Sequence, residues 1–273
     1  MEKSQERIDL LNRIALFEKE GRFNEDVEYD DPPKQILPKD VDYTIKKLSN
    51  KFMTVLANML GKMYFTHKIR KRTLIIKEVT GLENALSIKG GSFVTCNHFD
   101  ISDSYVVYRT VKPALIKRHY LYKVIKEGNY NNFKGVVRIL MRHANTLPLS
   151  SNFETMKLFY RGVGELLDRG EKILIYPEQA MWWNYKKPRP LKKGVFQLAC
   201  KFNKPILPVF VTMKDSDVID EGFPVQEYYV HYLPPIYPDE KLSPAENAAI
   251  MCEKNYKLWV DVYEKFYGKK LEY

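Results

Sequence analysis

The sequence is poor in cysteine. Its three cysteines, Cys96, Cys200 and Cys252, are too few and too scattered in 273 residues for a disulfide framework or a four-ligand zinc site. The charged first residues, MEKSQERID, lack the apolar stretch of a secretory signal, and no later apolar run is long enough to span a bilayer. We therefore expect a protein that is made and kept in the reducing cytoplasm and folds around an apolar core.

Acidic residues are outnumbered by basic ones. The chain has 44 Lys and Arg against 34 Asp and Glu, which gives a formal net charge of +10. Such a surface attracts phosphate-bearing partners, whether nucleic acid, anionic lipid or a phosphorylated cofactor. The sequence has no ribonucleoprotein signature, zinc-finger spacing or helix-turn-helix pattern, so we do not expect nucleic acid to be the partner.

Residues 1–72 are predicted to form a helical N-terminal segment. A short amphipathic helix is expected over 5–20 and an extended, acidic, proline-bearing linker over 25–42. Within 44–72 apolar residues recur at helical spacing, lysines lie off that stripe, and HKIRKR follows. This pattern favours either a helix that lies on an anionic membrane surface or one that packs its stripe on the core.

The rest of the chain, 73–273, alternates between strand-like and helix-like stretches. Strands are predicted at TLIIKEV, SFVTCN, KILIYP and ILPVFVTM, and helices at SYVVYRTV, YLYKVIKEG, FKGVVRILMRH, FETMKLFYRGVGELLDRG and GVFQLACKF, with a loop at ANTLPLSSN. A capping box at Ser243-Pro-Ala-Glu246 begins a terminal helix that runs to about residue 267. The pattern indicates an α/β fold, a central, mostly parallel mixed sheet flanked by helices, after an N-terminal helical, amphipathic segment.

One short stretch brings a histidine and two aspartates together where a strand should end. In Phe93-Val-Thr-Cys-Asn-His-Phe-Asp-Ile-Ser-Asp-Ser-Tyr105 an apolar run gives way to polar residues. Residues five apart point about 140° away from each other on a helix, so His98 and Asp103 meet only if His98 precedes the helix. With Asp100 as the N-cap, Asp103 falls in the first turn, where the helix dipole favours its carboxylate.

An imidazole held by such a carboxylate has a fixed tautomer and one nitrogen free to act as a general base. The alternative is that the aspartates only cap the helix and His98 is an ordinary loop residue. We expect no metal site, because no second histidine lies at ligand spacing nearby. The sequence has no Gly-x-Ser-x-Gly elbow, and Cys96 lies on the strand, where a core position is expected.

Four elements in sequence order resemble the glycerolipid acyltransferase family, typified by 1-acylglycerol-3-phosphate (lysophosphatidic acid) acyltransferases. They are Asn-His-x4-Asp after one strand, Tyr-Pro-Glu after another, Leu-Lys-Lys-Gly-Val-Phe-Gln-Leu-Ala opening a helix, and Pro205-Ile-Leu-Pro208-Val opening the next strand. The resemblance implies that His98 deprotonates an acceptor hydroxyl, which attacks an acyl thioester, while Asp103 orients the ring. No covalent acyl-enzyme is implied.

The resemblance also assigns roles to other residues. Glu178 corresponds to the glutamate of the family's Phe-Pro-Glu-Gly-Thr-Arg block, implicated in acceptor binding, and Pro205 and Pro208 match a block thought to shape the acyl-donor site. The family's phosphate-binding arginines are absent here, because the block reads Tyr-Pro-Glu-Gln-Ala-Met-Trp-Trp and the loop between His143 and Asn152 also lacks one.

Five cations beside this block are candidates to replace the missing charge, by gripping an acceptor phosphate or the phosphates of the donor: Lys186, Lys187, Arg189, Lys192 and Lys193. Among them we assign acceptor binding to Lys192 and Lys193; the alternative is a solvated, charged face. Trp182 and Trp183, which follow the Tyr-Pro-Glu motif, either contact a sugar or lipid or are packed inside the protein.

The combined features predict an O-acyltransferase that moves a fatty acyl chain to a lysophospholipid such as 1-acylglycerol-3-phosphate. The expected donor is acyl-CoA or acyl-carrier protein, with no further cofactor, and the expected location is the inner face of the membrane, on anionic lipid. One alternative is an acyltransferase with a non-phosphate acceptor, a glycolipid or amino-acid lipid. A second is a non-catalytic protein that binds a membrane surface or nucleic acid.

Overall fold

The computed structural model describes residues 2–28, 31–116 and 119–273 and contains a seven-stranded sheet. The strand order is β1-β7-β6-β2-β5-β3-β4, and every neighbouring pair is parallel except β6 and β7. The strands are β1 Ile75–Thr80, β2 Ser92–Thr95, β3 Leu121–Ile125, β4 Thr146–Pro148, β5 Lys172–Ile175, β6 Ile206–Asp220 and β7 Phe223–Tyr232. The predicted α/β class with a mostly parallel mixed sheet is confirmed.

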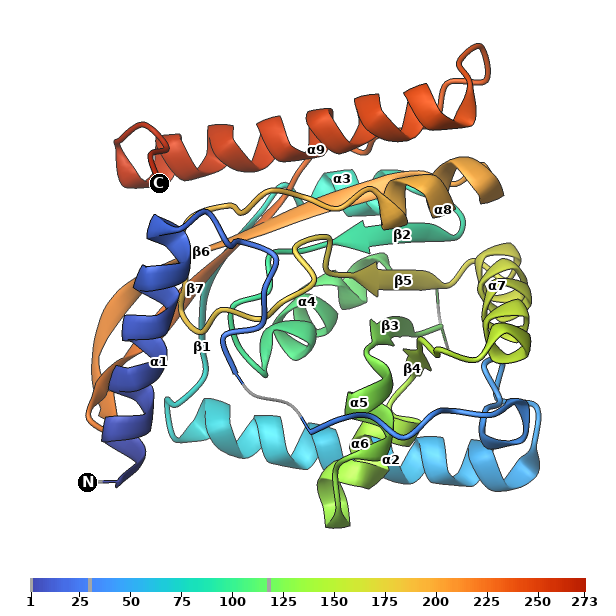
Figure 1. The fold of residues 1–273 in the computed structure, drawn as a ribbon, viewed down its shortest axis with the longest axis horizontal. Coiled ribbons are helices and arrows are strands. Elements are labelled where there is room, and N and C mark those ends of the chain that lie inside the picture. Colours follow the sequence, from blue (N-terminus) through green and yellow to red (C-terminus); the bar gives the residue numbers. More distant parts are fainter. Residues whose placement is uncertain (1, 29–30, 117–118) are drawn as a thin grey trace.

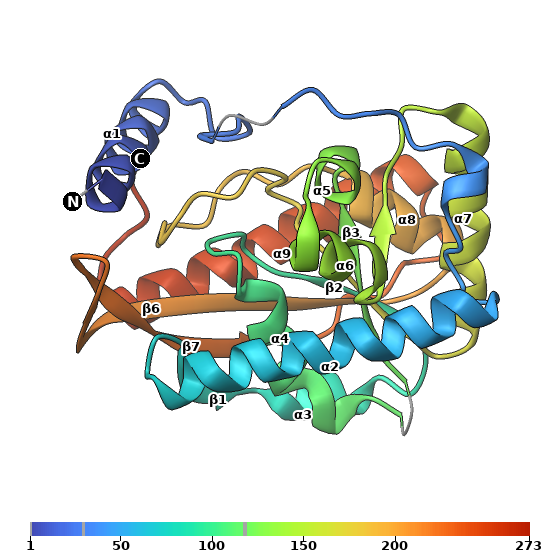
Figure 2. The same ribbon diagram turned by 90° about the horizontal axis from the view of Figure 1, so that it is seen from below.

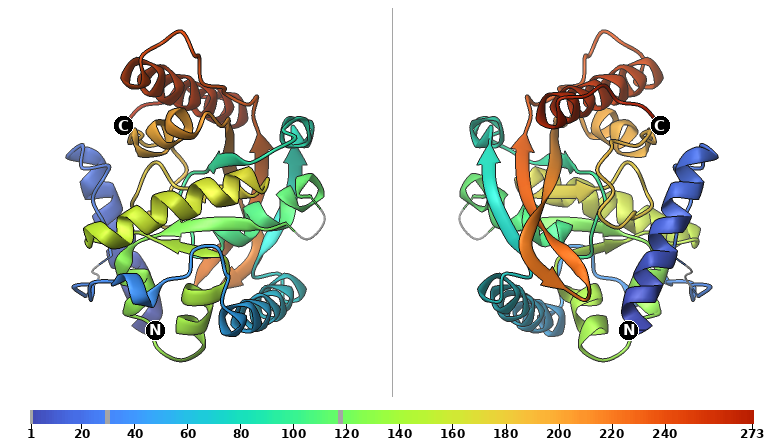
Figure 3. Two further views of the ribbon diagram at one scale, coloured as in Figure 1. Left: turned by 90° about the vertical axis from the view of Figure 1, so that its right-hand side faces the viewer. Right: turned by 90° about the vertical axis from the view of Figure 1, so that its left-hand side faces the viewer.

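Helices cover both faces of this sheet, as Figures 1 and 3 show. They are α1 Glu2–Lys19, α2 Leu48–Arg70, α3 Leu82–Ser87, α4 Asp103–Val111, α5 Glu127–Asn131, α6 Gly135–His143, α7 Phe153–Asp168, α8 Gly194–Phe202 and α9 Pro244–Tyr267, with 3-10 turns at Pro38–Asp40 and Lys112–Ala114. In the part of the chain that the structure describes, no helix has the length and apolarity needed to cross a membrane.

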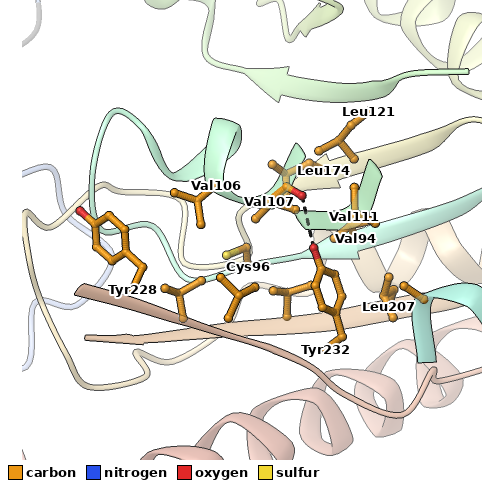
Figure 4. Close-up of a cluster of buried hydrophobic side chains, with 14 of the residues drawn as sticks. Val94, Cys96, Val106, Val107, Val111, Leu121, Leu174, Leu207, Tyr228 and Tyr232 are labelled. Carbon is orange, nitrogen blue, oxygen red and sulfur yellow. Dashed lines mark hydrogen bonds between the residues drawn. The ribbon is translucent and has the colours of Figure 1, made fainter. Parts of the chain in front are cut away.

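Successive side chains of β2 point to opposite faces of the sheet, and each face packs against its own layer of the core. Phe93 points into a cluster with α7, α8 and α9, whereas Val94 and Cys96 point into a second cluster with α3 and α4. Figure 4 shows this second cluster, in which Cys96 is fully buried, as predicted. Because β2 is covered on both faces, its exit loop is held in place by packing on either side.

Two sequence predictions between α4 and α7 are wrong. The stretch YLYKVIKEG, predicted as a helix, forms β3 followed by the short α5, and the predicted loop ANTLPLSSN contains the three-residue strand β4. A five-residue apolar run has no clear periodicity, so its parallel partners β4 and β5 determine that it becomes a strand. Strand β7, which pairs antiparallel with an extended β6, was not predicted from the sequence.

The N-terminal helix α1 and the arm after it pack on the outside of the sheet domain (Figures 1 and 2). Leu10, Ile14 and Phe17 of α1 form a buried cluster with Ala180 and Trp182. Farther along the arm, Ile36 is fully buried and its carbonyl accepts a hydrogen bond from Ser150 Oγ (2.8 Å). The predicted linker therefore lacks regular structure over most of its described length but is packed.

Candidate active site

The loop that leaves β2 is fixed by hydrogen bonds before it reaches His98. Asn97 donates through Nδ2 to the carbonyl of Val211 (3.0 Å) and accepts from its N–H at 2.8 Å, which ties the loop to β6. The next residue, His98, donates its backbone N–H to Glu178 Oε2 (3.0 Å), and its carbonyl accepts from the N–H of Trp182 (3.1 Å). The backbone of the histidine is thus held from two sides.

The structure brings His98 and Asp103 together. Nδ1 of His98 lies 2.6 Å from Oδ2 of Asp103, and the aspartate side chain is only 2% exposed. Asp103 is the first residue of α4, so the N–H groups of the first turn and the helix dipole favour its carboxylate. A proton on Nδ1 leaves the lone pair on Nε2, the nitrogen that a general base uses.

The helix begins later than predicted. Its N-cap is Ser102, not Asp100, and Asp100 instead accepts a hydrogen bond from the Ser102 N–H (2.8 Å) in a turn before the helix. The prediction that Asp103 lies in the first turn is nevertheless confirmed. The extra turn lets the chain reverse between His98 and Asp103, so that residues five apart can meet.

Tyr176, directly after β5, contacts both members of the pair. Its hydroxyl donates to Asp103 Oδ1 (2.5 Å), and its ring stacks on the His98 imidazole with centroids 4.0 Å apart and an interplanar angle of 13°. Burial, together with the nearby Asp103 charge, raises the pKa of Tyr176 well above its ordinary value. The tyrosine is therefore a neutral donor at any physiological pH.

Glu178 and Arg189 form a buried ion pair behind the histidine. Glu178 Oε2 accepts from Arg189 Nη2 (2.8 Å) as well as from His98, and Oε1 accepts from the Arg189 backbone N–H at 2.9 Å. The side chains are 2% and 0% exposed. The arginine also donates to the carbonyl of Phe23 (3.0 Å), and its guanidinium lies over the ring of Trp182. In this structure the glutamate supports the His98 loop, and its predicted role in acceptor binding stays a prediction.

A large cavity opens in front of the histidine. Its volume is about 1600 Å³, and its wall includes His98, Asp103 and Tyr176 together with apolar side chains of α2, α4, α6 and α7. It lies at the carboxyl ends of β2, β3 and β5, where parallel sheets place their ligand sites. A mostly apolar cavity of this size, with one histidine–carboxylate pair in its wall, suits a long hydrocarbon chain.

Lys123 is a wall residue that was not among the site residues predicted from the sequence. It lies on β3, lines the cavity, and burial lowers the pKa of its ammonium to about 8, although the Asp103 charge opposes this shift. A lone lysine within the apolar run Leu-Tyr-Lys-Val-Ile was the available signal, but the stretch was predicted as a helix. Tyr176 was visible only as the first residue of the Tyr-Pro-Glu motif.

The five cations offered for a phosphate lie in different surroundings. Lys192 is exposed and lines the cavity, whereas Lys193 is exposed and, among the described side chains, is not part of its wall. Lys186 pairs with Asp215 (3.4 Å), and Lys187 pairs with Glu18. Arg189 is held in the buried pair described above. Of the predicted replacements, Lys192 alone faces the space in front of His98.

Pro205 and Pro208 join β6 to β2. The carbonyl of Pro205 accepts from the Phe93 N–H (3.0 Å), and Pro208 lies beside Thr95 in the sheet. Neither is among the described residues of the cavity wall, so donor-site shaping stays a prediction for both. For Trp182 the packing alternative holds, because its side chain is fully buried against α1 and its Nε1 donates to the Glu25 carbonyl (3.0 Å).

Comparisons with known proteins bear on the family and the fold of the chain. The model of the acyltransferase family matches residues 77–212, a range that includes both members of the pair. The chain belongs to the acyltransferase family that this model describes. The fold is similar to that of the 1-acyl-sn-glycerophosphate acyltransferase PlsC from Thermotoga maritima, with a TM-score of 0.54 and 18% identity over 82% of this chain and 83% of that one. Among curated proteins, no sequence matches.

Proposed function

We propose that this acyltransferase moves a fatty acyl chain from an acyl thioester to the hydroxyl of a lysophospholipid such as 1-acylglycerol-3-phosphate, with His98 as the general base. The observation that carries the proposal is the His98–Asp103 hydrogen bond in the wall of an apolar cavity. The solved relative is described as acting on 1-acyl-sn-glycerophosphate, which supports this acceptor class.

The reaction needs no group beyond the substrates. Nε2 of His98 takes the proton of the acceptor hydroxyl as its oxygen attacks the thioester carbonyl, and Asp103 stabilises the imidazolium that forms. Collapse of the tetrahedral intermediate breaks the carbon–sulfur bond, and the thiolate leaves with the proton from Nε2. Lys123, in the same wall, offers positive charge to the oxygen that becomes negative during the attack.

Transfer of a labelled acyl chain tests the proposal directly. Incubation with acyl-CoA or acyl-carrier protein and a panel of lysolipids should yield a labelled diacyl product, whichever thioester serves. His98→Ala should reduce turnover by two or more orders of magnitude, the usual value of a positioned base, and Asp103→Asn should have a comparable effect. Near-normal turnover in either folded variant would support the helix-capping alternative, and failure to consume any thioester would favour a binding protein.

The identity of the acceptor depends on Lys192. If it grips a phosphate, Lys192→Glu should raise the apparent KM for lysophosphatidate by roughly tenfold or more, the value of one charge-assisted hydrogen bond, and should change KM little for a neutral lysolipid. Lys193→Glu makes the same charge change one residue outside the cavity wall and is the matched control. Equal effects of Lys192→Glu on both acceptors would favour donor binding or a glycolipid or amino-acid lipid acceptor.

We further propose that α2 docks the enzyme on an anionic lipid surface. Its apolar stripe is not buried in the domain: Leu48 is 82% and Phe52 69% exposed, and Val55, Met59 and Met63 are also exposed. The helix contacts the domain through other positions, among them the buried Ala57 and Asn58, whose Nδ2 donates to Asn145 (2.9 Å). Exposed apolar side chains flanked by lysines fit the boundary between acyl chains and head groups.

A further inference from the structure

Tyr176 forms a hydrogen bond to the oxygen of Asp103 that His98 does not use. Asp103 uses one carboxylate oxygen for His98 and the other for the hydroxyl of Tyr176, at 2.6 and 2.5 Å. The three groups come from different elements, namely the loop after β2, the start of α4 and the end of β5. The carboxylate therefore cannot rotate without breaking a hydrogen bond on one side or the other.

The ring of Tyr176 adds a second constraint. It lies parallel to the imidazole at van der Waals distance, so that it limits tilting of His98 about the bond to Asp103. A hydroxyl that donates to a carboxylate also shares its negative charge, and less of that charge remains to stabilise an imidazolium on the other oxygen. The same side chain can thus hold the geometry and moderate the field that His98 experiences.

We propose that Tyr176 is a positioning residue that fixes the Asp103 carboxylate and sets the pH at which His98 becomes active as a base. The proposal rests on the acyl transfer proposed above. It concerns the hydroxyl, because the ring alone would be supplied equally well by phenylalanine.

Other titratable groups face the pair. Cys96 on β2, Lys123 on β3 and Tyr228 on β7 lie near Asp103, and Glu178 lies behind the loop. Lys192 lines the same cavity, and Asp100 before α4 lies near Tyr228. Burial raises the pKa of Cys96 and of Tyr228. The negative charge of Glu178 is balanced by its ion pair with Arg189. Lys123 loses its proton near pH 8, so it affects the alkaline side of a pH–rate profile. An effect of the Tyr176 hydroxyl on His98 belongs to the acid side.

Tyr176→Phe separates the hydroxyl from the ring. Without the donor, Asp103 carries more charge toward His98 and holds the imidazolium more strongly, so more base is needed to deprotonate it. The acid limb of the kcat/KM profile should move to higher pH by roughly half to one unit, and kcat/KM on that limb should fall by roughly three- to tenfold. An unchanged acid limb in a folded Tyr176→Phe enzyme would overturn the proposal, even if activity fell.

Tyr232→Phe is the matched control. Tyr232 is also buried, and its hydroxyl donates within the core to the carbonyl of Val107 (3.2 Å). Its loss should lower stability much as the loss of the Tyr176 hydroxyl does, while the acid limb stays where it is in the wild type. A similar shift in both variants would show a general effect of a loosened core and would overturn the proposal.

A spectroscopic readout keeps the inference testable without turnover. In the full-length protein labelled with 15N-histidine, the His98 ring should titrate at higher pH in Tyr176→Phe than in the wild type, whether or not any lipid is acylated. If no lipid is acylated while the ring shift is seen, the proposed function fails and the positioning role stands. Should Tyr176→Phe not fold, the wild-type hydroxyl proton should exchange slowly and show a nuclear Overhauser effect to the His98 ring; its absence would contradict the geometry.

Discussion

Glu178 satisfies three donors, and at the scale of single residues this makes it a structural anchor as much as a candidate ligand. Its two oxygens accept from His98 and twice from Arg189, all inside the protein. A charge that has been removed from water is stable only while its partner is present. The same glutamate can therefore be essential for activity without touching the acceptor.

Glu178→Gln should destabilise the fold by about 3–5 kcal/mol, because it leaves the fully buried Arg189 without an anion. Urea unfolding at pH 7 measures this loss. Glu178→Gln combined with Arg189→Met should recover a large part of it, since no unpaired charge then remains. A variant of normal stability whose only defect is a higher KM for the acceptor would instead support the predicted binding role.

Lys172 is a second buried charge, and it lacks a carboxylate partner among the described side chains. The residue is only 2% exposed, and its ammonium has one long hydrogen bond, to Ser92 Oγ at 3.4 Å. Burial lowers the pKa of Lys172 from 10.5 to about 8. Between pH 8 and 10.5 the unfolded chain binds more protons than the folded one, so this residue makes the free energy of unfolding rise with pH. Below pH 8 the buried lysine is charged, and its full destabilising effect on the fold is present.

Lys172→Met should therefore raise the free energy of unfolding at pH 7 by about 2–3 kcal/mol. The advantage over the wild type should shrink as pH rises from 8 and be small near pH 10.5. Denaturant unfolding of both proteins across this range measures the difference. A constant difference at all pH values would show that the lysine is not buried in its charged form.

At the scale of secondary-structure elements, α2 both exposes an apolar stripe and forms part of the cavity wall. Leu48, Phe52 and Met63 of its exposed stripe lie outside the cavity wall, whereas Val55 and Met59 of the same stripe line the cavity. Deeper in the helix, Phe65 stacks on Tyr105 of α4 with centroids 4.1 Å apart. Deleting residues 44–72 would open the cavity as well as remove the stripe. Point substitutions at exposed positions outside the cavity wall change the apolar surface of the helix without opening the cavity.

Phe52→Asp combined with Met63→Glu should weaken sedimentation with anionic vesicles by roughly tenfold or more, because two apolar side chains no longer leave water. The thermal midpoint should change little, since both residues are exposed. Ile219→Asp, which changes an equally exposed apolar residue on the β6 hairpin, is the control and should bind as the wild type does. High salt should weaken wild-type binding. Unchanged binding of the double variant would exclude the stripe as the docking surface.

The elements predicted correctly are those whose own sequence determines them. The capping box of Ser243 and Glu246 begins α9, and the strand-to-polar transition after Phe93 places His98 in the exit loop of β2. The elements missed depend on neighbours: β4 is three residues long, and β7 is a strand because β6 lies beside it. Local periodicity does not contain that information.

The same limit applies to the site. His98 and Asp103 are five residues apart, so their meeting could be predicted from a strand end and a helix start. Tyr176 lies 73 positions from Asp103, and only the pairing of β5 with β2 brings it to the carboxylate. The burial of Arg189 could not be foreseen either, because it depends on the N-terminal arm.

At the scale of the whole molecule, the N-terminal arm completes the support of the site. The carbonyl of Phe23 accepts from Arg189, and that of Glu25 accepts from Trp182, so the beginning of the chain closes over the loop that holds His98. The arm lies outside the stretch that matches the family model, residues 77–212. The surroundings of the His98–Asp103 pair are thus built partly from residues outside the range that matches the family.

During synthesis this arm leaves the ribosome long before its partners exist. Trp182 follows Glu25 by 157 positions, which at about 5–20 residues per second is a delay of roughly 8–30 s. Over that interval Leu10, Ile14 and Phe17 have no loop to pack against, and an isolated helix of this length is only marginally stable in water. A nascent chain stalled before residue 182 should therefore present a protease-sensitive, chaperone-binding N-terminus, which becomes protected only when translation has passed the loop.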